Sequence, residues 1–186
     1  MKLILVRHGQ TIENLNGIIQ GQTPGTLTEL GHQQAEKVAE KLKSRDFDII
    51  YCSDLGRCLE TAKHIRVHHP DTPFETTDQI REISFGDIQG KLAADIDWAS
   101  IGGHFYTNRP GGGETLQELE KRVLKFISKL YAKHPNDTVL LVTHGGPIRA
   151  TNRYFTKGPV EDLLDWPIQN TMVVEYDVNE PLKIEE

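Results

Sequence analysis

Two histidines in this sequence each follow an apolar run of strand length. The run 2–6 (KLILV) is followed by RHG at 7–9, and the run 138–142 (TVLLV) is followed by THGG at 143–146. Continuous Val, Ile and Leu runs are typical of parallel strands buried on both faces, and ligands of open α/β sheets bind beyond the carboxyl ends of the strands. Both imidazoles are therefore expected at one edge of one sheet, beside an arginine that suits an anionic ligand.

Histidine and arginine at such an edge suit phosphoryl transfer. A neutral imidazole is a nucleophile near pH 7, and a transferring phosphoryl group needs cations and hydrogen-bond donors around its three equatorial oxygens. His8 is the candidate nucleophile, and Arg7 reaches the same pocket if Gly9 lets the chain turn. Arg57 follows another strand that feeds this edge, and its planar guanidinium binds phosphate in a bidentate way. His144 is expected as a second imidazole, protonated by the anionic ligand.

The leaving oxygen of such a reaction needs a proton donor. Glu82 lies within REISFG at 81–86, an irregular connection that we expect to fold over the sheet edge. A carboxyl group close to phosphate oxygens has a raised pKa, which suits a general acid. Glu82 is therefore the candidate acid.

The elements that must position these residues alternate between strands and helices. Strands are expected at 2–6, 49–52, 138–142 and 172–174, and helices at 29–44, 55–66, 115–130 and 146–154. The long helix opens on the capping box Thr115 and Glu118, and its apolar face repeats at helical spacing. This alternation predicts an α/β fold, a three-layer sandwich with a mostly parallel central sheet and helices on both faces.

Three stretches carry no helical or strand pattern of useful length. The first, 10–28, is a polar, Gly-rich loop whose length is typical of functional loops. The second, 72–90, is short strand and turn. The third, 91–113, is irregular and ends in the glycines 111–113, which we interpret as a flexible entry to the long helix.

Length, charge and cysteine content narrow the class of protein. The 186 residues predict a single domain over 1–186, with a short lid or insertion around 91–113. A net charge of −6 argues against nucleic-acid and anionic-membrane partners, and no apolar stretch approaches the ~20 residues of a membrane span. Met1 leads directly into a short strand rather than a signal peptide, and there are only two cysteines, so a cytoplasmic location is expected. The sequence does not specify an oligomeric state.

Other chemistries find weaker support. The chain has eight histidines but no HExxH or paired-carboxylate spacing, so no metal site is expected. Asp95-Ile96-Asp97 lacks the buried strand and the threonine of an aspartyl phosphatase motif. Only four residues separate Cys52 from Arg57, one fewer than a thiol phosphatase loop needs, and both Cys52 and Cys58 are interpreted as small core residues. Neither a phosphate-binding P-loop nor a dinucleotide motif occurs, and no cofactor is expected.

Four blocks of this sequence resemble the histidine phosphatase superfamily, also called the phosphoglycerate-mutase-like family. The blocks occur in family order and span most of the chain: RHGQTIEN (7–14), SDLGRCLETA (53–62), REISFGDIQG (81–90) and VTHGGPIR (142–149). The resemblance implies that His8 carries a phosphohistidine intermediate, that Arg7, Arg57 and His144 surround the phosphate, and that Glu82 donates the proton. It also implies a set of substrate-binding positions: Asn14, Gln20, Gly21 and the backbone N–H of Gly145.

The sequence departs from the family pattern beside these residues. Gln10 stands where many members have glutamate, Gln89 stands where glutamate is frequent, and 22–26 lacks the usual Asp-x-Pro. These positions bear on substrate choice. Because 91–113 is short and contains few basic residues, it favours hydrolysis over transfer to a second phosphate-bearing acceptor.

We therefore expect a metal-independent phosphatase of the phosphatase branch, acting on small-molecule phosphomonoesters. Two alternatives are kept: a phosphoglycerate mutase-type phosphotransferase, and a non-catalytic phosphate-binding module.

Overall fold

A five-stranded sheet forms the centre of the molecule. The computed structural model describes residues 1–100, 106–161, 163 and 166–184. Within them the sheet has the strand order β3-β2-β4-β1-β5. Its strands are β1 (Lys2–Arg7), β2 (Ile49–Ser53), β3 (Phe74–Thr77), β4 (Thr138–Thr143) and β5 (Val173–Asp177). The first four are mutually parallel and β5 pairs antiparallel with β1. The predicted mostly parallel sheet is confirmed.

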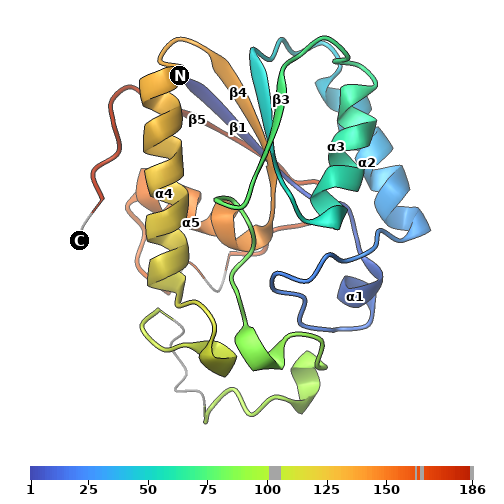
Figure 1. Cartoon of the computed structure of the whole chain (residues 1–186), viewed down its shortest axis with the longest axis vertical. Coiled ribbons are helices and arrows are strands. Elements are labelled where there is room, and N and C mark those ends of the chain that lie inside the picture. The colour runs from blue at the N-terminus through green and yellow to red at the C-terminus, as the bar shows by residue number, and fades with distance from the viewer. Residues whose placement is uncertain (101–105, 162, 164–165, 185–186) are drawn as a thin grey trace.

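Helices cover both faces of this sheet. The helices that cover it are α2 (Glu29–Leu42), α3 (Gly56–Arg66), α4 (Leu116–Lys133) and α5 (Gly145–Thr156). The short α1 (Ile12–Leu15) lies in the loop that follows β1. In Figure 1, α2 and α3 lie on one side of the sheet and α4 and α5 on the other. Short 3₁₀ turns occur at Gly86–Ile88, Ala93–Asp95 and Pro110–Gly112. The predicted three-layer sandwich is confirmed.

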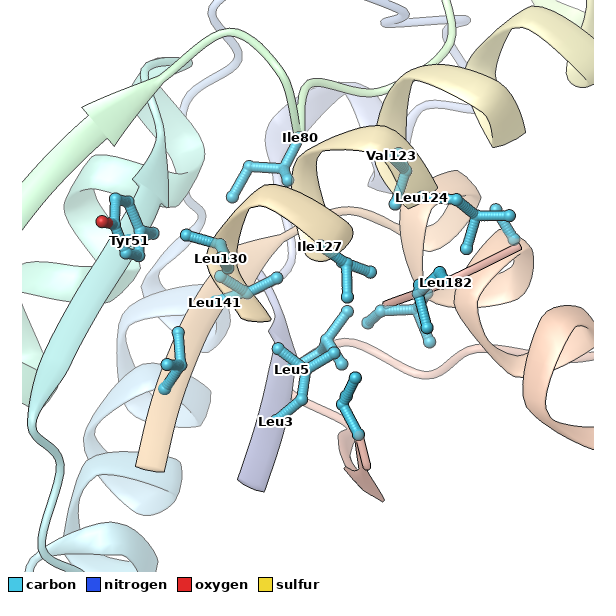
Figure 2. Packing of buried hydrophobic residues seen from close by; sticks show 14 of the residues in the cluster. Leu3, Leu5, Tyr51, Ile80, Val123, Leu124, Ile127, Leu130, Leu141 and Leu182 are labelled. Atoms are coloured by element: carbon cyan, nitrogen blue, oxygen red, sulfur yellow. The ribbon is translucent and has the colours of Figure 1, made fainter. Parts of the chain in front are cut away.

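Alternate residues of each inner strand feed two separate cores. On β1, Leu3 and Leu5 pack into the cluster beneath α4, whereas Ile4 and Val6 pack into the cluster beneath α2 and α3. Figure 2 shows Leu3 and Leu5 facing Ile127 of α4. All four strand residues are fully buried, which is why the strand reads as one continuous apolar run.

Helix α4 begins as its sequence predicts. Thr115 and Glu118 form both halves of the capping box, the hydroxyl of Thr115 accepting from the Glu118 N–H and the Glu118 carboxylate from the Thr115 N–H. The apolar face predicted for this helix is buried, apart from Phe126, which is half-buried. Leu124 is also buried and belongs to the same face. Among the described residues, neither α4 nor any other helix is long and apolar enough to cross a bilayer.

Two expected loops contain more structure than predicted. The segment 10–28 includes α1 and the bridge between Thr11 and Leu27. The glycines 111–113 are not simply flexible, because a Cβ at Gly113 would overlap the carbonyl oxygen of Ser84. Gly111 and Gly112 have φ of 56° and 73°, a backbone that glycine adopts without strain. Residues 101–105 of the expected lid lie outside the described residues.

The chain leaving β1 crosses the first turn of α2 at very short range. A Cβ at Gly31 would overlap the carbonyl oxygen of Gln10, and a Cβ at Gly9 would overlap the carbonyl oxygen of Gly31. Gly9 is not one of the residues with positive φ, so the structure favours glycine there because of this close approach. The crossing fixes the direction in which the chain leaves the sheet beyond His8.

We predict that Gly31→Ala lowers the free energy of unfolding by about 1–3 kcal/mol, because the added methyl forces two backbone segments apart. Urea unfolding followed by circular dichroism measures the loss. Gln33→Ala, at an exposed position of the same helix, is the matched control and should change stability by less than about 0.5 kcal/mol. Equal stability of the Gly31 variant and the parent would contradict the close approach.

Candidate active site

His8 lies directly after β1, and its backbone is held by the neighbouring strand. Its N–H donates to the carbonyl of Thr143 at 3.0 Å. The side chain is buried, and Nδ1 lies 2.7 Å from the carbonyl oxygen of Gly9. Because a carbonyl only accepts, Nδ1 carries the proton and Nε2 keeps a free lone pair. Burial, followed by the charges of Arg57 and Arg7, holds the His8 pKa well below its usual value.

His144 follows the neighbouring strand β4 and is the N-cap residue of α5. Its ring lies against that of His8, with 5.3 Å between the ring centroids. Arg57 Nε donates to His144 Nδ1 at 3.1 Å, which makes Nδ1 the unprotonated nitrogen, and Nε2 lies 2.8 Å from Ser53 Oγ. Burial and Arg57 lower its pKa well below the usual value. These contacts fit a neutral imidazole, and the expected protonation of His144 by an anionic ligand stays a prediction.

Arg57 is held rigidly by backbone carbonyls. It is 1% exposed, at the start of α3. Its Nη2 donates to Gly21 O at 2.7 Å, and its Nη1 donates to Thr23 O at 2.5 Å and Pro24 O at 3.3 Å. With Nε on His144, four of its five N–H groups are engaged and one on Nη2 is left for a ligand.

Arg7 is less completely satisfied than Arg57. Its Nη1 donates to the carbonyl of Ile168, but its buried Nε finds no hydrogen-bond partner among the described residues. Burial lowers the Arg7 pKa, Glu82 raises it, and Arg149 and Arg57 lower it. The three arginines therefore lie near one another and near the carboxylate of Glu82. A buried guanidinium N–H without a partner is costly and is commonly found where a ligand supplies the acceptor.

Glu82 meets the first turn of α5. Its carboxylate accepts from the Gly146 N–H at 3.1 and 3.2 Å, and also from its own neighbour, the Ile83 N–H, at 3.0 Å. The positive end of a helix dipole stabilises such a carboxylate. The chain reaches this point because Ile80 is fully buried and its carbonyl accepts from Thr143 Oγ1 at 2.7 Å. The irregular connection therefore lies over the sheet edge, as predicted.

The expected substrate-binding residues take different positions. Gly21 lies against Arg57, and Gln20 is 8% exposed with no partner for its Oε1 among the described residues. Asn14 Oδ1 lies 3.5 Å from Asn170 Nδ2, which in turn donates to the His8 carbonyl at 3.1 Å. At the α5 terminus it is the N–H of Gly146, next to the predicted Gly145, that binds Glu82.

Two functional positions were missed by the sequence reasoning. Arg149 lies beside Gly145, with its Nη1 3.1 Å from the position that a Cβ of Gly145 would take. Burial lowers the pKa of Arg149, and the charge of Glu82 offsets part of this shift. The signal was present, since Arg149 is one helical turn after Gly145 in the block 142–149. Asn170, behind His8, lies outside the four blocks, and nothing in its sequence surroundings indicated it.

The glutamines that depart from the family pattern support the backbone. Gln10 Oε1 accepts from Thr28 Oγ1 at 2.9 Å, at the N-cap of α2. Gln89 Oε1 accepts from the N–H of Gln22 at 2.8 Å and of Phe85 at 3.2 Å, and so ties two active-site loops together. Among the described residues, no group of three or more His, Cys, Asp or Glu side chains is arranged to hold a metal ion.

We predict that His8 and His144 hold opposite neutral tautomers, with the proton on Nδ1 of His8 and on Nε2 of His144. Because both pKa values lie well below 6.5, the rings should stay neutral at pH 6. Protons taken up only by the unfolded chain then lower the free energy of unfolding as the pH falls below about 6.5. ¹⁵N NMR of histidine-labelled protein, assigned with His8→Asn and His144→Asn, tests this. A ring that titrates as it does in urea would contradict it.

Known proteins are similar to this chain in both sequence and fold. Residues 3–182 match the histidine phosphatase superfamily (branch 1). A probable phosphatase of Schizosaccharomyces pombe is 35% identical over 158 residues, which cover 83% of this chain and 73% of that protein. A metal-independent phosphoserine phosphatase of Arabidopsis thaliana is 34% identical over 158 residues, covering 80% of this chain and 66% of that protein. The structure of mycobacterial glucosyl-3-phosphoglycerate phosphatase is similar with a TM-score of 0.82 and 31% identity, covering 94% of this chain and 88% of that chain. The chain thus belongs to the histidine phosphatase superfamily.

Proposed function

We propose that this protein hydrolyses phosphomonoesters without a metal ion, through a phosphohistidine intermediate on His8. One observation carries the proposal: the hydrogen bond from His8 Nδ1 to the Gly9 carbonyl leaves Nε2 unprotonated, beside the buried Arg57 and the half-buried Arg7. An imidazole that binds a structural partner through one nitrogen and keeps the other as a lone pair is prepared for nucleophilic attack.

In the first step, Nε2 of His8 attacks phosphorus, and the bond from phosphorus to the leaving oxygen breaks. Arg7 and Arg57 stabilise the charge on the equatorial oxygens, Arg7 through its unpartnered Nε–H and Arg57 through its remaining Nη2 hydrogen. The anion favours the protonated form of His144, whose positive charge then adds to that of the two arginines. Glu82 passes its proton to the leaving oxygen as the alcohol departs.

In the second step, the Glu82 carboxylate takes a proton from water as the water oxygen attacks the phosphohistidine. The bond between phosphorus and His8 Nε2 breaks, and the electron pair returns to the imidazole. Inorganic phosphate leaves, and Glu82 is again protonated for the next cycle. Both steps use the Glu82 carboxyl group, which is held at the Gly146 N–H in the first turn of α5.

Hydrolysis is favoured over mutase chemistry by the segment 91–113, which we propose acts as a short lid of a single domain. A mutase must hold a second phosphate while the intermediate waits. Apart from Lys91 at its start, the basic residue of this segment is Arg109, which is already bound to Glu118 and to the carbonyl of Gly113. The relatives described above are named as phosphatases, among them one named for phosphoserine. We propose a small-molecule phosphomonoester as the substrate, and a cytoplasmic location remains a prediction.

We predict that wild-type protein, mixed with a labelled phosphomonoester and quenched, carries a base-stable, acid-labile phosphate adduct. His8→Ala should abolish both the adduct and steady-state hydrolysis, because no other nucleophile replaces Nε2. His68→Ala, at an exposed position just after α3, is the matched control and should retain both. An adduct that persists in the His8 variant would contradict the assignment. Tight phosphate binding without turnover would favour a non-catalytic module.

We further predict that turnover on a panel of phosphomonoesters is unchanged by a chelator and needs no bisphosphate primer. The panel should include sugar phosphates, phosphoglycerates and phosphoserine, with released phosphate as the readout. Loss of activity with chelator and its recovery with a divalent ion would overturn metal independence. Isomerised phosphoglycerate formed faster than free phosphate would favour the mutase alternative.

A further inference from the structure

Glu82 lies on a connection without regular structure, yet a general acid must be held within a fraction of an ångström of its working position. The support comes from helix α4. Arg122 of α4 donates from Nη1 to the carbonyls of Gln79 at 2.8 Å and of Arg81 at 3.1 Å. Longer contacts of 3.5 Å reach the carbonyls of Asp78 and Glu82. One guanidinium thus binds the backbone on which the acid is carried.

Arg122 is itself fixed by a carboxylate. Its Nε and Nη2 donate to Glu114 at 2.9 and 2.7 Å in a bidentate pair. The two side chains are only 18% and 15% exposed, so this pair is shielded from water more than a surface ion pair. A planar, bidentate contact fixes the orientation of the guanidinium, which a single point charge would not.

Glu114 also holds the chain on the far side of Glu82. Its N–H donates to the carbonyl of Ser84 at 2.7 Å, and its carboxylate lies 3.4 Å from the Ser84 N–H. Arg122 therefore binds the backbone before and at Glu82, and Glu114 binds it two residues later. The carboxylate between them reaches the Gly146 N–H.

We propose that Arg122, oriented by Glu114, is a positioning residue for the proton donor Glu82. The inference rests on the proposed function, in which Glu82 protonates the leaving oxygen. Arg122 contacts backbone atoms of the connection, so its effect on the reaction passes through the placement of the Glu82 carboxylate. Its loss should therefore lower kcat/KM, which reports the step in which the leaving group departs, mainly for substrates whose leaving group needs a proton.

The test compares substrates whose leaving groups differ in their need for a proton. A 4-nitrophenolate leaves as a stable anion near neutral pH, whereas the alkoxide of phosphoserine or another alkyl phosphate does not. For Arg122→Met we expect kcat/KM to fall about 30-fold or more with the alkyl ester and less than about 5-fold with 4-nitrophenyl phosphate, since general acids contribute about 10²–10⁴-fold. Glu82→Gln should show the same preference more strongly.

The double variant Glu82→Gln/Arg122→Met separates positioning from other effects. If Arg122 acts through Glu82, adding Arg122→Met to Glu82→Gln should cost little further activity with the alkyl ester. Additive losses, or equal losses with both substrates in the single Arg122 variant, would overturn the inference. A Glu82→Gln variant without leaving-group dependence would instead remove the acid role from the proposed function, and the positioning role with it.

Two further variants address folding. Arg153→Met breaks a comparable pair with Glu120, whose side chains are 23% and 7% exposed and which does not touch 78–84. It should lower thermal stability without leaving-group dependence. Glu114→Gln keeps the size of the side chain and removes the charge that orients Arg122. It should reproduce the leaving-group dependence more weakly. If Glu114→Gln instead loses activity equally with both substrates, the proposal is contradicted even if Arg122→Met does not fold.

Discussion

The parallel register between β1 and β4 is the constraint on which the active site depends. Arg7 pairs with Thr143, so both strands end at the same level, and the residues that follow are His8 and His144. The hydrogen bond from the His8 N–H to Thr143 O carries this pairing one residue past the strands. A shift of one residue would turn the side chains of β1 to the opposite face and exchange its two cores. The same burial that stabilises the sheet thereby fixes the distance between the two imidazoles.

The charges around this pair have two effects at once. Arg57 and Arg7 lower the pKa of His8, and Arg57 also lowers that of His144. Burial and the two arginines, the groups proposed to bind an anionic phosphoryl group, therefore favour the neutral form of His8. Once an anion enters, it offsets part of this positive charge, and protonation of an imidazole becomes easier.

Much of this arrangement was predictable from the sequence, because strands and caps have local signatures. The apolar runs before His8 and His144, and the capping box at Thr115, indicated the sheet edge and α4 at nearly their observed positions. Close approaches left no such signature. The crossing of Gly9 and Gly31 depends on two segments distant in sequence, and the reason for either glycine is visible only when both are in place.

Contacts between a side chain and backbone that is distant in the sequence could not be predicted either. Arg122 reads from the sequence as a charged residue on the polar side of an amphipathic helix, which is usually solvated. Asn170 lies near the C-terminus, outside every recognisable block, although it binds the carbonyl of His8. Such residues bind backbone carbonyl oxygens. Because every residue has a carbonyl oxygen, the sequence does not indicate which one is the partner. Charge pairs on neighbouring turns, by contrast, can be found by their spacing.

The active site thus combines two kinds of support. His8, His144 and Arg57 are attached directly to strands or to the first turns of helices, so the core fixes them. Glu82 is attached to an irregular connection, and its position comes from a contact with α5 at Gly146 and from Arg122 on α4. Helix α4 is bound to the sheet by Val123, the residue next to Arg122, which is fully buried in the core. The position of Glu82 therefore depends on the same core that fixes the position of His8.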